Sequence, residues 1–284
     1  MRTKPLGPSG PLLSIIGFGA WEIGIDPSPQ ARERALGALQ AAVDAGMTWV
    51  DTAEEYGRGR SEELVAQALA DRPDIFVCTK LLPRFHGGLS PAAVRAGAEA
   101  SLRRLRREVL DLYLIHEPDA TSALEDVWGA MARLVEDGLA RFIGLSNFDA
   151  DLVAQCERVR HVDAVQDHYS LLHRDAYAAL RPHCEQYGTA FLAYGPLALG
   201  LLTGRIAPAT SFTTTSWGSD KTAATLSPYQ RALFRSCRAA AAPTRGRAAA
   251  PGGGAARAPA GGAGAGLGRE SRWLHAGDRG LDVD

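Results

Sequence analysis

The chain has 284 residues, 46% of them hydrophobic, with 31 basic and 32 acidic side chains. That length suits one large domain, and about 250 residues is typical of an eight-fold β/α barrel. The balanced charge offers no basic face for nucleic acid, and there is no run of about 18 apolar residues that would span a membrane. The four cysteines show no CxxC spacing, as expected of a protein in the reducing cytoplasm.

The first elements predicted along the chain are a short hairpin and a series of buried strands. The hairpin is Lys4–Ser14, with its turn at Pro8-Ser9-Gly10, and we expect it to cover the bottom of a barrel. The strands are short apolar runs rich in Val, Ile, Phe or Tyr, which is typical of strands buried on both faces. They are Ser14–Ala20, Met47–Thr52, Ile75–Lys80, Leu110–His116, Arg141–Asn147, Val162–Tyr169 and Thr189–Pro196.

Amphipathic helices are predicted between these strands. Their first turns carry small polar residues that can cap a helix N-terminus, and the first helix ends at Gly46. The predicted caps are Ser28, Ser61, Ser90 and Ser122, the last forming a capping box with Glu125. A basic run is expected on the solvated face of its helix, and it consists of Arg103, Arg104, Arg106 and Arg107.

Regular alternation of strands and helices predicts parallel strands joined by right-handed crossovers. An open dinucleotide-binding sheet would need G-x-G-x-x-G running into a helix, and Gly17-Phe-Gly19 lacks the third glycine and the helix. Ionisable residues gather instead at the carboxyl ends of several strands, which is typical of a closed barrel. The predicted fold class is therefore α/β, a (β/α)8 TIM barrel with an N-terminal hairpin.

Four of the residues at or after the strand ends form a set suited to proton transfer without a metal. Asp51, Lys80 and His116 end three successive strands, and Tyr56 follows Asp51 in the next loop. The ordinary pKa of tyrosine is about 10, and a nearby Lys80 cation is expected to lower the pKa of Tyr56. Asp51 would hold Lys80 in place, and His116 would donate a hydrogen bond to a substrate oxygen.

These residues lie in motifs that resemble those of the aldo-keto reductases, in the same order along residues 1 to about 235. The motifs are GMTWVDTAEEYG from Gly46 with Ser61-Glu62, LYLIH from Leu112, IGLSNF from Ile143, QDHYSLL from Gln166 and AYGPLALGLLTG from Ala193. The resemblance implies reduction of an aldehyde or ketone to an alcohol. NADPH would supply the hydride, with Tyr56 as proton donor and Asp51, Lys80 and His116 completing a catalytic tetrad.

The resemblance also implies a cofactor site. Ser146, Asn147 and Gln166 match the positions that hold the nicotinamide carboxamide, and Tyr194 matches the ring stacked on the nicotinamide. The loop that would bind the pyrophosphate contains Leu197, Gly200 and Leu202. Two aromatic residues follow strand ends and are candidates for a substrate pocket, Trp21 and Phe85. No histidine has the spacing of a metal site, so we expect no metal.

The C-terminal part departs from this pattern. Residues 238–268 consist almost wholly of Ala, Gly, Arg and Pro, with one Leu and no acidic residue, a composition that cannot bury a core. We therefore divide the chain into a barrel of residues 1–235 and a low-complexity tail of 236–284, either disordered or read out of frame. An eighth strand and the family's clamp for the adenosine 2′-phosphate are not recognisable, so the sequence does not decide between NADPH and NADH.

Three functions remain open at this point. The first is a reductase acting on a small carbonyl substrate. The second is a nucleotide-binding or partner-binding subunit on the same fold that does not catalyse a reaction, because a fold does not fix a function. The third is a damaged, inactive family member that lacks the C-terminal cofactor clamp. The intact tetrad favours the enzyme. The sequence predicts neither the substrate nor the oligomeric state.

Overall fold

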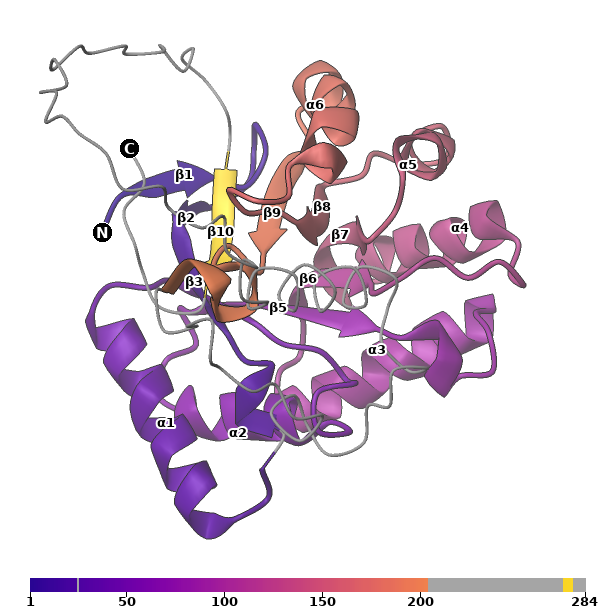
Figure 1. The fold of residues 1–284 in the computed structure, drawn as a ribbon. Helices are drawn as coiled ribbons and strands as arrows, with labels where there is room; N and C mark the ends of the chain where they lie inside the picture. Colours follow the sequence, from indigo (N-terminus) through magenta and orange to yellow (C-terminus); the bar gives the residue numbers. More distant parts are fainter. Residues whose placement is uncertain (25, 204–272, 278–284) are drawn as a thin grey trace, which may run out of the picture. The chain divides into compact units, whose positions relative to one another are not determined.

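The computed structural model describes residues 1–24, 26–203 and 273–277 (Figure 1). Two compact units are distinguished, Met1–Leu199 with Arg272–Asp284, and Gly200–Ser271. The barrel belongs to the first unit, and the described part of the second is confined to residues 200–203. The predicted boundary at residue 235 and the low-complexity run 238–268 lie outside the described residues.

Seven consecutive parallel strands form the barrel wall. Five of them lie within predicted apolar runs, and the third and the fifth each extend one residue beyond theirs, to Leu81 and from Ala140. Neighbours along the chain are neighbours in the sheet, as expected for right-handed β/α crossovers. The prediction of an α/β barrel is therefore confirmed. The strands are β3 (Ile16–Gly19), β4 (Trp49–Asp51), β5 (Phe76–Leu81), β6 (Leu110–Ile115), β7 (Ala140–Ser146), β8 (Ala164–His168) and β9 (Ala190–Tyr194).

The structure corrects the expectation that no eighth strand is present. Strand β10 (Trp273–Gly277) pairs in parallel with β9 on one side and with β3 on the other, which closes the barrel. This strand lies within the segment that composition assigned to the tail. The run has the length of a strand, but it follows low-complexity residues and lacks an alternating pattern. The sequence analysis therefore did not recognise it.

Helices lie around the strands on their outer side (Figure 1). They are α1 (Pro29–Asp44), α2 (Arg60–Ala68), α3 (Pro91–Leu105), α4 (Leu124–Glu136), α5 (Ala150–Glu157) and α6 (Asp175–Tyr187). The described residues also include three short 3-10 helices, η1 (Glu22–Gly24), η2 (Pro83–Phe85) and η3 (Ala198–Thr203). None of the helices among these residues is both long and apolar enough to cross a membrane.

Two of the four predicted caps are confirmed. The hydroxyls of Ser28 and Ser90 accept hydrogen bonds from backbone N–H groups in the first turns of α1 and α3. The predictions for Ser61 and Ser122 are wrong. Ser61 lies inside α2, where its buried hydroxyl donates to the carbonyl of Ala20, and the Ser122 hydroxyl is engaged by Asp119 instead of by α4.

The barrel core has an inner and an outer layer because successive side chains of a strand point to opposite faces. In β6, Leu112 and Leu114 belong to the inner cluster, whereas Tyr113 and Ile115 pack in the outer cluster under the helices. The hairpin of β1 (Thr3–Pro5) and β2 (Leu12–Ser14) contributes Leu6 and Leu13 to the inner cluster. The hairpin thus plugs the barrel interior, as predicted.

Gly144 lies on β7 at a place where the backbone of β8 comes so close that only glycine fits. A Cβ atom there would lie 2.2 Å from the carbonyl oxygen of Ala164 on β8, so the backbone of one strand would have to shift. We expect Gly144→Ala to lower the free energy of unfolding by about 1–3 kcal/mol. Gly129→Ala in helix α4 is the matched control, because a Cβ there meets nothing within 4 Å.

Urea unfolding followed by circular dichroism compares the two variants. Gly129→Ala is expected to raise the free energy of unfolding by about 0.5–1 kcal/mol, because alanine is less flexible than glycine in the unfolded chain. Equal effects of the two substitutions would contradict the close packing of β7 against β8.

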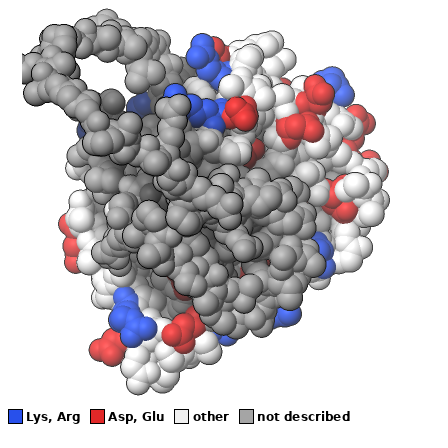
Figure 2. Space-filling model, viewed as in Figure 1, with Lys and Arg blue, Asp and Glu red and all other residues white. Residues whose placement is uncertain are grey.

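The described surface carries both signs of charge. In the view of Figure 2, the blue Lys and Arg side chains and the red Asp and Glu side chains are interspersed on the part that is not grey. This distribution agrees with the near-zero net charge of the sequence.

Candidate active site

The predicted tetrad residues are brought together at the carboxyl ends of three neighbouring strands. Asp51 is the last residue of β4, Lys80 lies near the end of β5, and His116 follows β6. Tyr56 lies in the loop between β4 and α2. Because parallel barrel strands end at the same face, residues far apart in the sequence meet there.

Lys80 is the centre of this group. Its side chain is fully buried, and Nζ donates hydrogen bonds to Asp51 Oδ1 at 2.6 Å, to the carbonyl oxygen of Thr52 at 2.8 Å and to the Tyr56 hydroxyl at 3.3 Å. An ammonium group has three N–H donors, so each of them has an acceptor. The lysine therefore connects the carboxylate and the phenol in one fixed arrangement.

Burial and charge act in opposite directions on these groups. Burial is the largest single influence on Lys80 and lowers its pKa, but Asp51, Tyr56 and Cys78 together outweigh it and the pKa is raised. Burial raises the pKa of Tyr56 to about 12, although the Lys80 cation acts to lower it. The expected decrease in the pKa of Tyr56 is therefore corrected, because desolvation of the phenol outweighs the cation. A raised pKa keeps Tyr56 protonated, which is the form that a proton donor needs.

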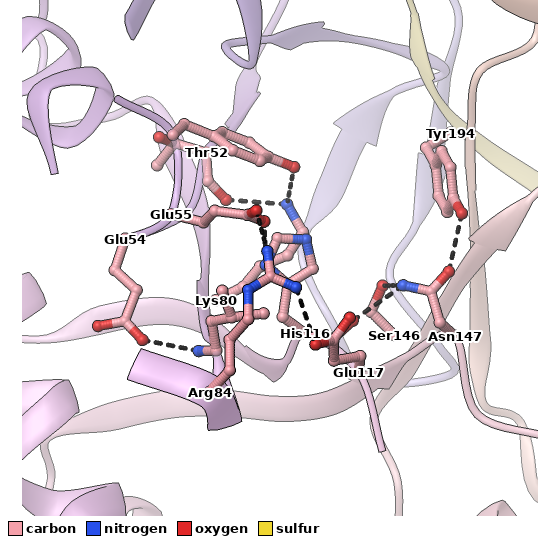
Figure 3. A network of polar contacts seen from close by, with 12 residues as sticks. Thr52, Glu54, Glu55, Lys80, Arg84, His116, Glu117, Ser146, Asn147 and Tyr194 are labelled. Atoms are coloured by element: carbon pink, nitrogen blue, oxygen red, sulfur yellow. Dashed lines mark hydrogen bonds and ion pairs between the residues drawn. The ribbon is translucent and has the colours of Figure 1, made fainter. Parts of the chain in front are cut away.

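His116 lies beside Tyr56, and their rings meet edge to face with centroids 5.7 Å apart. The acidic residues that precede Tyr56 and follow His116 in the sequence share one arginine. Arg84 pairs with Glu55, next to Tyr56, and with Glu117, next to His116 (Figure 3). One guanidinium thus links the loop that carries the phenol to the loop that carries the imidazole. The sequence analysis missed this link.

A second cluster lies at the ends of β7 and β9. Asn147 donates to the carbonyl oxygen of His116 at 2.9 Å and to the Ser146 hydroxyl at 3.0 Å, and it accepts from the Tyr194 hydroxyl at 2.8 Å (Figure 3). Its φ of 63° is left-handed, a region that asparagine tolerates better than most residues. The predicted group of Ser146, Asn147 and Tyr194 is therefore brought together.

Gln166 connects this cluster to the tetrad. Its side chain donates from Nε2 to Asp51 Oδ2 at 2.7 Å, and its backbone carbonyl accepts from the Asn147 N–H at 3.0 Å. Both side chains of the Gln166–Asp51 pair are buried. The sequence assigned Gln166 to a cofactor alone and gave no sign of the contact with Asp51.

The remaining predicted residues lie in loops and turns. Trp21 directly follows β3, and Phe85 ends η2, where its exposed ring lies under Arg58. Leu197 comes after β9, and Gly200 and Leu202 lie on η3. Their assignment to a pyrophosphate and to a substrate stays a prediction.

A buried charge network behind the tetrad was not predicted. Glu62 is fully buried on α2, where it accepts from the Thr79 hydroxyl at 2.6 Å and from Arg104 Nε at 2.5 Å. Glu54 lies in the Tyr56 loop, and it accepts from the backbone N–H of Leu82 at 2.6 Å. The expectation that Arg104 is solvated is wrong. Glu62 shares the apolar stripe of α2 with Val65, Ala66 and Leu69, a signal that could have revealed the network.

The prediction for Arg107 is also wrong. Its guanidinium donates to Asp111 Oδ2 at 2.7 Å and to the carbonyl oxygen of Ile75 at 2.7 Å, so it ties the end of α3 to the starts of two strands. In the part of the chain that the structure describes, no group of His, Cys, Asp and Glu could hold a metal ion.

Comparison with known proteins adds an independent finding. Residues 15–243 match the model of the aldo/keto reductase family. A probable voltage-gated potassium channel subunit beta of Oryza sativa subsp. japonica is 34% identical over 222 residues, covering 73% of this chain and 67% of that protein. Probable aldo-keto reductase 1 of Glycine max is 32% identical over 209 residues, covering 70% and 60%.

Solved structures agree with the sequence matches. The aldo-keto reductase of Klebsiella pneumoniae in complex with NADPH has a TM-score of 0.64 and 32% identity, with 70% of each chain covered. The chain thus spans about two thirds of the length of the curated relatives it matches.

Proposed function

Since the chain belongs to the aldo/keto reductase family, we propose that it reduces a small aldehyde or ketone to the alcohol with NADPH as hydride donor. The observation that carries this proposal is the contact of one buried ammonium, Lys80, with both the Asp51 carboxylate and the Tyr56 hydroxyl. This contact of a buried cation with a phenol favours an enzyme over a binding protein that does not catalyse a reaction.

In this proposal, Tyr56 provides the proton that the product alcohol needs. As the carbonyl oxygen gains negative charge, the hydroxyl of Tyr56 protonates it, and the neighbouring Lys80 cation stabilises the tyrosinate that forms. Asp51 keeps Lys80 charged, as the raised pKa of the lysine indicates. His116, whose ring lies against Tyr56, would donate a hydrogen bond to the same oxygen.

The polar groups near the tetrad fit a nicotinamide carboxamide. Ser146 accepts from Asn147 through its oxygen, so its hydroxyl hydrogen is oriented elsewhere and can donate to the amide oxygen. Gln166 uses Nε2 on Asp51, which leaves its carbonyl oxygen to accept from the amide nitrogen. The Tyr194 hydroxyl is fixed on Asn147, so its ring has a defined position against which a nicotinamide could stack. When bound, the cofactor supplies the hydride.

Backbone groups near Leu197, Gly200 and Leu202 would contact the pyrophosphate, and Trp21 and Phe85 would contact the substrate.

We place the activity in the cytoplasm. The thiols of Cys78, Cys156 and Cys184 are free, as a reducing compartment favours.

Cofactor binding and turnover test the function separately. The full chain is melted with and without NADPH or NADH, and NADPH at about 100 times its dissociation constant is expected to add about 2.7 kcal/mol to the free energy of unfolding. Loss of NADPH absorbance is then followed with small aldehydes and ketones. Stabilisation without turnover of any carbonyl compound would contradict the reductase and favour a nucleotide-binding subunit.

A further inference from the structure

The Asp51 carboxylate is held at both of its oxygens. Oδ1 accepts from Lys80 at 2.6 Å and Oδ2 accepts from Gln166 at 2.7 Å. We propose that Gln166 is a positioning residue of the tetrad, which fixes the Asp51 carboxylate in addition to its proposed place in the carboxamide site. The catalytic part of this inference rests on the proposed function, whereas the contact itself can be tested in the protein without cofactor.

The bond crosses the inside of the barrel. Asp51 ends β4 and Gln166 lies on β8, two strands that are not neighbours in the sheet. Gln166 is 3% exposed and Asp51 is 5% exposed, so water does not compete freely for either side chain. An amide N–H donating to a buried carboxylate is among the stronger hydrogen bonds of a protein.

Fixing the second oxygen matters because Lys80 contacts only the first. A carboxylate held at one oxygen can still turn about its own axis, and each such rotation would change the distance to Lys80 Nζ. With Gln166 on Oδ2, the rotation is stopped, and Lys80 remains within hydrogen-bond distance of Tyr56. Gln166 therefore acts on the proton donor Tyr56 indirectly, through the side chains of Asp51 and Lys80.

The same contact decides which way the Gln166 amide faces. An Asp51 carboxylate can only accept, so the NH2 of Gln166 must point to it and the carbonyl oxygen must point away. That oxygen can accept a hydrogen bond but cannot donate one. Asp51 thus ensures that Gln166 presents a hydrogen-bond acceptor to a bound carboxamide. The Gln166 side chain couples the tetrad to the proposed carboxamide site.

Gln166→Glu tests the contact because it places two carboxylates against each other. The Lys80 cation is already paired with Asp51, and the Cys78 thiol also contacts that carboxylate. The new buried carboxylate therefore has no cation of its own, and its pKa rises above the ordinary value of about 4.3 for Glu. The folded variant holds a proton that the unfolded chain has lost, and its stability falls as the pH rises. Between about pH 5.5 and pH 8.5 we expect its Tm to drop by about 2 °C or more relative to the wild type.

Two further proteins make the result specific. Gln40→Glu is the matched control, because it makes the same change at an exposed position of α1 and should follow the wild type at every pH. The double variant Asp51→Asn/Gln166→Glu lacks the opposing carboxylate. The Tm difference between it and the single variant Asp51→Asn should therefore not depend on pH. All melts use the full chain without cofactor.

Measurements of turnover test whether the Gln166–Asp51 contact affects catalysis. The kcat of Gln166→Glu is expected to fall with rising pH more steeply than that of the wild type, while Gln40→Glu follows the wild type. If Gln166→Glu weakens NADPH binding but has the wild-type dependence of Tm on pH, Gln166 serves the carboxamide alone and the proposal is overturned. A kcat profile parallel to the wild type also overturns it. Absence of turnover in the wild type itself would refute the proposed function, and the melts would still decide the contact.

Discussion

Tyr56→Phe is expected to lower kcat by about 10²–10⁴-fold, the usual contribution of a general acid, while NADPH affinity stays near the wild-type value. The substitution removes only the hydroxyl that accepts from Lys80 Nζ, and Lys80 keeps its bonds to Asp51 and Thr52. Steady-state turnover of a carbonyl substrate measures the loss, and the shift of Tm with NADPH measures the binding.

The matched control is Tyr187→Phe, which removes the same hydroxyl from an exposed residue at the end of α6. It should leave kcat unchanged. Retention of more than about a tenth of the wild-type kcat by Tyr56→Phe would be inconsistent with a general-acid contribution of this size and would assign the proton donor to another group.

Lys80→Met is expected to lower the free energy of unfolding by about 3–5 kcal/mol, besides abolishing turnover. The side chain is fully buried, and its removal leaves the Asp51 carboxylate without its cation in the barrel interior. Breaking one member of a buried pair costs this much because the other charge remains desolvated. Chemical unfolding at neutral pH measures the loss.

Two observations identify Asp51 as the cause of that loss. Asp51→Asn/Lys80→Met should recover a large part of the stability, because neither side chain then carries a charge. The deficit of Lys80→Met should also shrink as the pH falls. Without its cation Asp51 is expected to have a raised pKa in the folded state, so the folded protein takes up a proton before the unfolded chain does. Lys4→Met, at a partly buried hairpin position, is the control and should cost less than about 1 kcal/mol.

The parts of the site that lie within one strand and the next loop could be predicted from the sequence. Strand ends of a parallel barrel share one face, so Asp51, Lys80 and His116 could be brought together from their places in the pattern alone. The bond from Gln166 to Asp51 could not. It depends on the curvature of the sheet and on which residues of β4 and β8 lie at the same level along the barrel axis. Neither property can be read from a local sequence pattern.

Burial explains two of the other differences, and a competing local hydrogen bond explains the third. The sequence shows that Lys80 is near Tyr56, but the desolvation that raises the pKa of Tyr56 comes from the whole surroundings. Arg104 lies among other arginines, as on a solvated helix face, yet it pairs with buried Glu62 on the adjacent helix α2. Ser122 has the spacing of a capping box, but Asp119, three residues earlier, binds its hydroxyl first.

The hairpin plug has a consequence for the order in which the chain acquires its structure. Leu6 and Leu13 share the inner cluster with Ala190 and Leu192 on β9, which are synthesised much later. The two leucines therefore lack these partners until β9 has left the ribosome. Contacts between such distant segments form slowly and leave apolar surface open to aggregation meanwhile. The nascent chain therefore has a long interval in which a chaperone would protect its N-terminal segment.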